Sequence, residues 1–122
     1  MTLGLALAAW TERDERMVAV AADTRISSNH APLTDAGLKT YELGGRCAMV
    51  TSGHALPPMM TAEITRSFVE NHNRRTQSKK VSFFDTVRLA SFFLKRAAEE
   101  QGAISRVVVA GFLGGGAPCL EV

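Results

Sequence analysis

Apolar and polar positions follow one another in blocks along this chain of 122 residues, and each block predicts one structural element. Residues 2–9 and 17–22 are continuous apolar runs, a pattern typical of strands that are covered on both faces. The polar residues 11–16 lie between them, so the two runs are expected to form a hairpin. A stretch rich in Ser, Asn and Pro at residues 27–37 predicts a loop.

Four further apolar segments predict strands, arranged as two hairpins around glycine turns. Gly44-Gly45 is the turn of the earlier of these two hairpins, which is the second hairpin of the chain. The glycine run at residues 114–116 is the turn of the last hairpin. The segment at residues 106–112 is apolar enough to need cover on both of its faces. The segments are residues 38–43, 46–51, 106–112 and 118–122.

Between the second hairpin and the last strands, the apolar residues recur with a helical period. Met60, Ile64 and Phe68 stand four residues apart. This spacing predicts an amphipathic helix over about residues 58–74 that packs through these three side chains. Two prolines at its start suit a first helical turn, where a missing N–H costs little. Residues 71–80 are polar and predict the loop that follows.

A second helix is predicted from a capping box at Ser82 and Asp85 to Gly102, which suits the left-handed position after a helix end. Its apolar face repeats at steps of four and three residues. Phenylalanines widen this face, so we expect the helix to touch more than one neighbour. The residues of the face are Phe83, Val87, Ala90, Leu94 and Ala97, and the widening side chains are Phe84, Phe92 and Phe93.

The order of the predicted elements indicates an α+β fold in a single domain over residues 1–122. Two hairpins, two helices and a last hairpin follow one another, and the helices are expected to pack on one face of an antiparallel sheet. The other face needs cover as well, because the strands are too apolar to lie in water. No second layer is apparent, so we expect a second sheet to come from another chain or from a longer parent protein.

Composition and charge exclude several classes of protein. Hydrophobic residues make up 46% and charged residues 21% of the chain, and the net charge of +2 comes without a basic stripe for nucleic acid. The apolar start lacks a basic n-region, so neither a signal peptide nor a membrane span is expected. Cys47 and Cys119 are isolated thiols, which suits a reducing compartment, and the cytoplasm is the expected location. The histidines form no ligand cluster and the glycine run opens no phosphate loop, so no metal or organic cofactor is expected.

Three short motifs resemble one family in their order and spacing. An apolar strand ends in Asp23-x-Arg25, Lys39 follows sixteen residues after Asp23, and Gly53 follows fourteen residues after Lys39. These spacings resemble those of proteasome β subunits and of the peptidase subunit of the bacterial ATP-dependent two-component protease, which are N-terminal-nucleophile hydrolases. The strand at residues 107–112 also resembles the strand after that family's second helix. The resemblance covers essentially the whole chain, but only the first half or so of the family's fold.

The resemblance implies an αββα sandwich, of which this chain would supply about half as antiparallel hairpins with two adjacent helices. It implies a threonine peptidase that works as a homo-oligomer, in a ring or in stacked rings. The expected substrates are peptides or unfolded proteins, and an ATPase is a further expected partner. Neither a cofactor, nor nucleic acid, nor a membrane is implied.

Carried over by position, the resemblance also implies a catalytic site. Thr2 becomes N-terminal when the initiator methionine is removed, and its own α-amine, with an unperturbed pKa of about 8, would take the hydroxyl proton. Lys39 would be the ammonium that stabilises negative charge, and Asp23 would hold it in place. The backbone N–H of Gly53 would donate to the oxyanion, and Arg25 would support the pair from behind.

Two alignments of the first strand with the family remain open. In one, Thr2 begins the strand as the nucleophile. In the other, Thr2-Leu3-Gly4-Leu5 matches the family's Thr-(Ile/Val)-Gly-(Val/Ile) run two residues further along, and Thr2 lies inside the strand. The second alignment predicts a non-catalytic structural subunit of the same fold. A hydrolase of small amides is a third hypothesis, since the substrate pocket would lie partly in segments that this chain lacks.

Overall fold

The computed structural model describes residues 4–13, 15–23, 26–28, 31–34, 39–53, 56–76, 79–102, 105–114 and 116–121. Strands and helices follow one another as in an α+β fold, which confirms the predicted fold class. The strands before the helices are β1 (Gly4–Trp10), β2 (Arg16–Ala22), β3 (Ile26–Ser28), β4 (Ala31–Thr34), β5 (Thr40–Gly44) and β6 (Cys47–Gly53). The helices and the last strands are α1 (Leu56–Arg75), α2 (Phe83–Gln101), β7 (Ser105–Phe112) and β8 (Pro118–Glu121).

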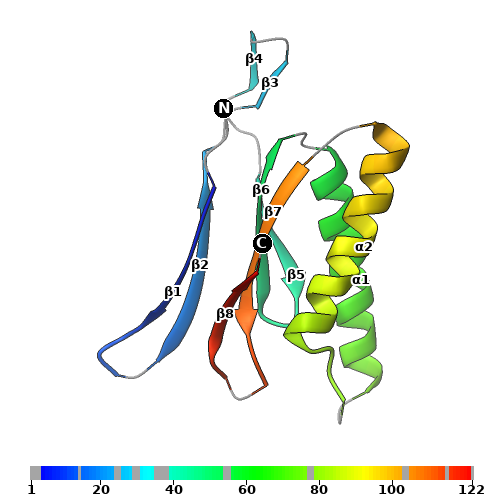
Figure 1. Cartoon of the computed structure of the whole chain (residues 1–122). Helices are drawn as coiled ribbons and strands as arrows, with labels where there is room; N and C mark the ends of the chain where they lie inside the picture. The colour runs from blue at the N-terminus through cyan, green and yellow to red at the C-terminus, as the bar shows by residue number, and fades with distance from the viewer. Residues whose placement is uncertain are drawn as a thin grey trace.

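The strands form separate antiparallel sheets that stack in layers. The central sheet has four strands in the order β5-β6-β7-β8, and α1 and α2 cover one of its faces (Figure 1). β1 and β2 pair along their whole length, from Gly4 with Ala22 to Trp10 with Arg16. This hairpin lies against the opposite face of the central sheet (Figure 1). Hairpin, central sheet and helix pair therefore form three layers.

The expectation that this chain supplies no second layer is wrong, because its own β1–β2 hairpin lies against the face of the central sheet opposite the helices. β1 and β2 do not join the central sheet by hydrogen bonds, but pack on it through alternate side chains. The other set of side chains faces outward, and Leu5 and Leu7 are 58% and 51% exposed. Within the described part of the chain, only one face of β1 is therefore covered. Its apolar run predicts that both faces are covered.

β3 and β4 form a small hairpin in a stretch for which the sequence predicts a loop. The pairing is irregular, with a shift of register between Ile26 and Ser27. Ser, Asn and Pro are frequent in the turns of short hairpins as well as in longer loops, so composition alone does not separate the two. The prediction of a loop over residues 27–37 is wrong where these two strands lie.

The predicted limits of the second helix are confirmed by its caps. The Ser82 hydroxyl accepts a hydrogen bond from the Asp85 N–H at 3.2 Å, and Gly102 ends α2 in the left-handed conformation with a φ of 63°. α2 touches both α1 and β7, as its wide apolar face predicts. Phe84 and Phe92, which were predicted to widen this face, are only about half covered, with exposed fractions of 50% and 58%. The buried members of the predicted face are Phe83, Ala90 and Ala97.

The predicted packing face of α1 is wrong, because Ile64 and Phe68 are 45% and 51% exposed. Short side chains let α1 approach the sheet closely: Val69 Cγ1 lies 3.2 Å from the position that a Cβ on Gly44 would take. The period of four in the sequence marks a real stripe, but one that faces away from the core. The residues that α1 buries are Pro57, Pro58, Thr61, Ala62, Thr65 and Val69.

The hydrophobic core lies between the central sheet and the two helices. Its closest approach is at Gly111 of β7, where an added Cβ would lie 2.5 Å from Cδ2 of Phe83 and 2.9 Å from Sγ of Cys47. The absence of a side chain at Gly111 thus makes room for the Phe83 ring at the start of α2. The cluster consists of Leu43, Cys47, Met49, Ala62, Phe83, Ala90 and Val109.

Candidate active site

Lys39 and Asp23, sixteen residues apart in the sequence, form an ion pair in the structure. The Lys39 Nζ lies 2.9 Å from an Asp23 carboxylate oxygen and donates a hydrogen bond to it. The lysine side chain is only 7% exposed and that of the aspartate 36%. Burying an ammonium is costly unless an opposite charge and hydrogen bonds compensate for the lost water, so a lysine in this position needs its carboxylate.

Backbone pairing fixes Lys39 at one end of the central sheet. Its carbonyl accepts a hydrogen bond from the Thr51 N–H at 3.0 Å, which extends the β5–β6 ladder by one step. Gly53 follows two residues after Thr51 and pairs with Ser105 at the start of β7. Lys39 and Gly53 therefore lie at the same end of the sheet.

Gly53 ends β6 with a φ of 95°, a conformation that side-chain-bearing residues rarely adopt. Glycine thus lets the chain leave the sheet and enter α1 within a few residues. A backbone N–H at a glycine is also unobstructed by a side chain, which is what an oxyanion donor requires.

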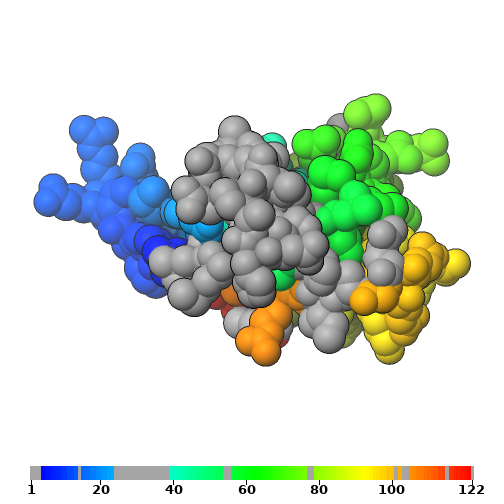
Figure 2. All heavy atoms as spheres, turned by 90° about the horizontal axis from the view of Figure 1, so that it is seen from above, coloured from blue at the N-terminus to red at the C-terminus, as the bar shows by residue number. Residues whose placement is uncertain are grey.

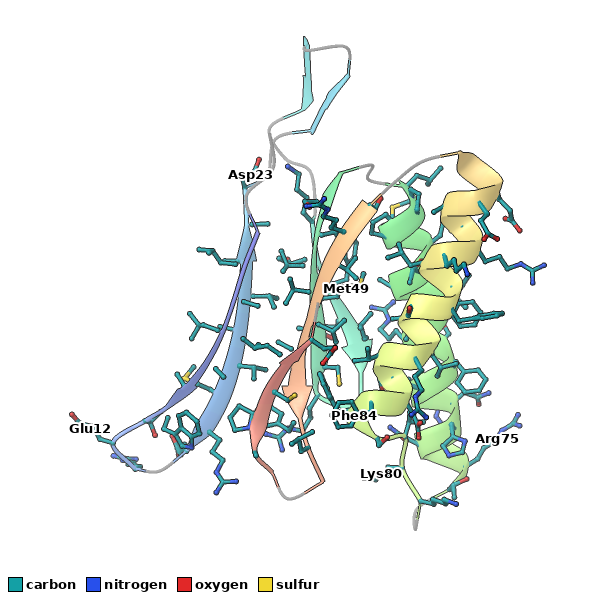
Figure 3. All side chains as sticks on the ribbon, in the orientation of Figure 1. Glu12, Asp23, Met49, Arg75, Lys80 and Phe84 are labelled. Atoms are coloured by element: carbon teal, nitrogen blue, oxygen red, sulfur yellow. The ribbon has the colours of Figure 1, made fainter. Side chains whose placement is uncertain are left out.

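The start of β1 reaches the same end of the molecule. Gly4 pairs with Ala22, the residue before Asp23. A Cβ on Gly4 would lie 2.8 Å from Cγ2 of Val50, so the first strand passes close over β6. Asp23 stands at this end in Figure 3, far from the hairpin tip at Glu12. The structure thus brings together the start of the first strand, the Asp23–Lys39 pair and the end of β6.

Thr2 and Arg25 lie outside the described residues. Their roles as nucleophile and as supporting cation therefore stay predictions. Of the five predicted site residues, the structure brings Asp23 and Lys39 into contact and places Gly53 at their end of the sheet.

The arrangement has a definite chemical capacity. A buried ammonium disfavours protonation of a neighbouring amine and stabilises negative charge on a neighbouring oxygen. The hydrogen bond to Asp23 holds the ammonium in place. Among the residues that the structure describes, no three His, Cys, Asp or Glu side chains group as a metal ion would require. No helix in these ranges combines the length and apolarity needed to cross a bilayer.

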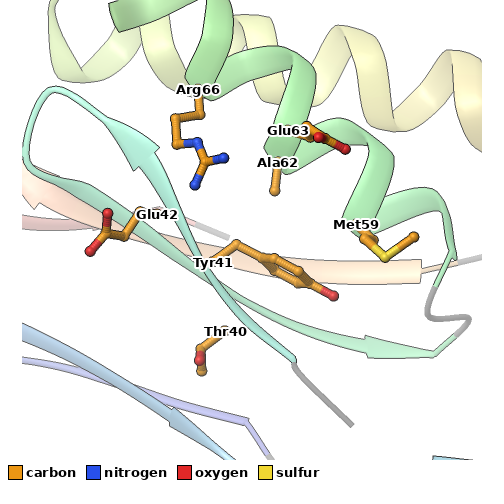
Figure 4. Close-up of a pocket in the computed structure, with 7 residues that line it drawn as sticks. All are labelled: Thr40, Tyr41, Glu42, Met59, Ala62, Glu63 and Arg66. Carbon is orange, nitrogen blue, oxygen red and sulfur yellow. The ribbon is translucent and has the colours of Figure 1, made fainter.

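A cavity of about 370 Å³ beside β5 was missed by sequence reasoning (Figure 4). It opens between β5 and α1, and β5 begins one residue after Lys39. Burial raises the pKa of the Tyr41 hydroxyl. A single tyrosine in a predicted strand carries no signal for a cavity, because the opposite wall comes from a helix later in the chain. The lining residues are Thr40, Tyr41, Glu42, Met59, Ala62, Glu63 and Arg66.

The buried thiol of Cys47 belongs to the core and not to this site. Burial raises its pKa, and a hydrogen bond with Thr86 acts in the opposite direction. A thiol held in its neutral form is a poor nucleophile. Cys47 is therefore a packing residue.

No protein-family model matches the chain, and no curated protein matches it either. The resemblance to N-terminal-nucleophile hydrolases therefore stays a prediction, drawn from the motif spacing.

Proposed function

We propose that this chain is a subunit of a proteasome-type N-terminal-nucleophile hydrolase that cleaves peptide bonds. The observation that carries the proposal is the buried Lys39 ammonium, 2.9 Å from Asp23, at the end of the molecule where β1 begins. A buried ion pair is a costly arrangement that apolar residues can replace without loss of stability. Its presence beside the first strand is explained by chemistry at the N-terminus.

The proposed nucleophile is Thr2, exposed as the first residue after removal of Met1. The proposal requires the Thr2 hydroxyl to reach the end of the sheet that carries Lys39, and two residues of chain, which span at most about 7 Å, separate Thr2 from Gly4. The threonine α-amine accepts the hydroxyl proton while the oxygen attacks the carbonyl carbon of the substrate. The N–H of Gly53 and the Lys39 ammonium stabilise the negative charge of the tetrahedral intermediate, with Arg25 behind them.

Collapse of this intermediate breaks the peptide bond. The protonated α-amine gives its proton to the leaving amine, and the acyl group stays on the threonine oxygen as an ester. Water, deprotonated by the same amine, then hydrolyses the ester and restores the enzyme. The proposed substrate is an extended, unfolded chain. The proposed assembly is a homo-oligomeric ring with an ATPase as partner.

Covalent labelling of Thr2 tests this function. Intact mass of the purified protein is expected to lack Met1, and a peptidyl epoxyketone or β-lactone is expected to form one adduct, at Thr2. Lys39→Met, which keeps the aliphatic length but removes the charge, is expected to lower the labelling rate at least a hundredfold, a loss of the size seen for one electrostatic donor. Lys80→Met, an exposed lysine far from the pair, serves as the matched control. Retention of Met1, or labelling at equal rates in both variants, refutes the proposal.

A non-catalytic subunit of the same fold is the second candidate, and the exposed apolar surface favours it. Leu5, Leu7 and Trp10 of the first hairpin are all more than half exposed, which suits a protein whose main task is packing in an assembly. This alternative predicts a sizeable oligomer that the epoxyketone never labels. If labelling occurs but peptides are not cleaved, a panel of small amides tests the third hypothesis, a small-amide hydrolase.

A further inference from the structure

The first hairpin moves away from the central sheet toward its tip. At its start the two layers touch, because a Cβ on Gly4 would lie 2.8 Å from Cγ2 of Val50. Figure 1 shows the ribbons diverging toward the tip, and in Figure 2 the blue spheres of the hairpin stand out on the side away from the helices. A cavity of about 440 Å³ lies between the layers, beside the turn at Gly44. It is at the opposite end of β5 from Lys39.

The sheet side of this cavity carries a positive charge in a fixed position. Arg46 follows the Gly44-Gly45 turn with a φ of 64°, so the geometry of the turn determines its backbone. Its guanidinium lies 4.3 Å from the centre of the Phe112 ring, a cation–π contact that holds the side chain over β7. Arg46 forms no ion pair with any residue that the structure describes. Its N–H donors are therefore available to an anion.

Two further charged residues line the cavity. Arg16 reaches from the hairpin to the β7–β8 turn, because its Nη1 lies 3.5 Å from the position that a Cβ on Gly116 would take. Glu42 belongs to β5, an edge strand, and lines this cavity as well as the one beside Tyr41. Among the described residues Glu42 has no ion-pair partner, so it does not neutralise Arg46. Charges of both signs thus face one space.

The remaining lining is mostly apolar and comes from three strands. Met17 and Val18 belong to β2, Ala48 to β6 and Phe112 to β7. Met49, the neighbour of Ala48, is buried in the core on the helix side, so Ala48 faces the hairpin. Small-molecule sites are typically cavities of about 300–1,000 Å³ that combine an apolar lining with a few placed polar groups. The volume and the lining of this cavity meet that description.

We propose that this cavity binds a small zwitterion with an apolar body, which is the chemistry of an apolar amino acid or a dipeptide. Arg46 donates two parallel N–H bonds to the carboxylate, and Arg16 adds a second positive charge. Glu42 accepts hydrogen bonds from the ammonium group. The aliphatic part of the ligand lies against the apolar lining. The site lies at the other end of the sheet from Lys39, so it does not depend on hydrolase activity.

The fluorescence of Trp10 gives a direct measurement of binding. Trp10 is the single tryptophan of the chain and pairs with Arg16 across the hairpin, so both side chains lie on the same face. L-leucine and the dipeptide L-leucyl-L-leucine are the probes, each titrated to about 10 mM, which covers weak binding. A saturable change in fluorescence is expected, with calorimetry as the second measurement. The tighter of the two probes identifies the source of the ligand, and L-leucine contains no peptide bond to cleave.

Derivatives of the tighter probe test both charges. The N-acetyl derivative lacks the positive charge and the C-terminal amide lacks the negative charge. Each is expected to bind about tenfold more weakly or worse. Arg46→Gln is expected to weaken binding of the zwitterion to the same extent and to leave binding of the amide unchanged. Glu42→Gln is expected to weaken binding of the zwitterion and to leave binding of the N-acetyl derivative unchanged.

Arg75→Gln and Glu70→Gln are the matched controls, because each removes an exposed charge of the same kind on α1. Both are expected to bind like the wild type, and circular dichroism verifies that every variant folds. Absence of saturable binding for both probes overturns the proposal. Equal affinity for the zwitterion and its derivatives, or binding that Arg46→Gln and Glu42→Gln leave unchanged, also overturns it. Labelling of Thr2 is a separate measurement, so failure of the hydrolase proposal and failure of this site are distinguishable.

Discussion

The two faces of the central sheet are covered to very different degrees. On the helix side, Met49 and Val109 are buried in a closed cluster that includes Phe83 of α2. On the hairpin side, the sheet itself buries Val50, yet no described residue of β1 or β2 is buried. The strands on both sides are similarly apolar in sequence. The difference teaches that burial is decided by how much surface the neighbouring layer offers, and a two-stranded hairpin offers less than two helices.

The largest expected effect sharpens this comparison directly. Phe83→Ala is expected to lower the free energy of unfolding by about 3–5 kcal/mol, because it removes a buried ring and leaves a cavity. Leu7→Ala, on the exposed face of the hairpin, is expected to cost about 0.5 kcal/mol or less. Urea denaturation measures both. If Leu7→Ala costs as much as Phe83→Ala, the outer face of the hairpin is covered in solution and the contrast between the two sides fails.

A second prediction concerns how tightly the helix side is closed. Gly111→Ala is expected to destabilise the protein by about 1–3 kcal/mol, because the new methyl would overlap the Phe83 ring. Gly114→Ala is the matched control, since a Cβ there would meet nothing within 4 Å. Thermal unfolding compares the two variants. Equal melting temperatures would mean that α2 can move away from β7 without a loss of stability.

The third prediction tests whether the buried hydroxyl groups on the helix side lack hydrogen-bond partners, including water. The hydroxyl of Thr65 is buried and has no hydrogen-bond partner among the described residues, so Thr65→Val is expected to stabilise the protein by about 1 kcal/mol. Thr86 is equally buried, but its hydroxyl donates to the Ser82 carbonyl at 2.9 Å. Thr86→Val is therefore expected to destabilise by about 1 kcal/mol. Urea denaturation measures the change in the free energy of unfolding for both variants. If both substitutions stabilise the protein, or both destabilise it, this interpretation of the interior is wrong.

The smallest expected effect is a dependence of stability on alkaline pH. Burial raises the pKa of Cys47 above its ordinary value of 9.0, so the folded state favours the neutral thiol. The resulting stability is fully present below pH 9.0 and is lost as pH rises through the raised pKa. Cys47→Ala is expected to reduce this alkaline loss, as measured by denaturation across the pH range. Cys119, which packs at the margin of the same core cluster and is only partly buried, is expected to react with iodoacetamide faster than Cys47 in the native protein.

Local signals predicted the elements well. The Ser82 cap, the Gly102 stop and the glycine turns act over a few residues, so their outcome depends little on the rest of the chain. The packing face of α1 was predicted wrongly for the opposite reason. Ile64 and Phe68 are its most apolar candidates, but the space between α1, the sheet and α2 admits only short side chains such as Thr61 and Thr65.

In the candidate site, too, local features were predictable from the sequence and contacts between distant segments were not. The spacing from Asp23 to Lys39 was visible in the sequence, whereas their contact depends on the hairpin layer lying over the start of β5. Sequence reasoning did not find the cavity beside Tyr41, because one wall belongs to a strand and the other to a helix.

By itself, the sequence determined the α+β class and the order of the elements apart from the β3–β4 hairpin, because propensities, caps and turns act on neighbouring residues. Only the tertiary structure decided that the first hairpin forms its own layer, that α1 turns its large apolar side chains outward, and that an ammonium is buried beside a carboxylate. Each of these outcomes depends on surfaces that meet from distant parts of the chain. The free energy of such contacts is a property of the pair and not of either segment alone.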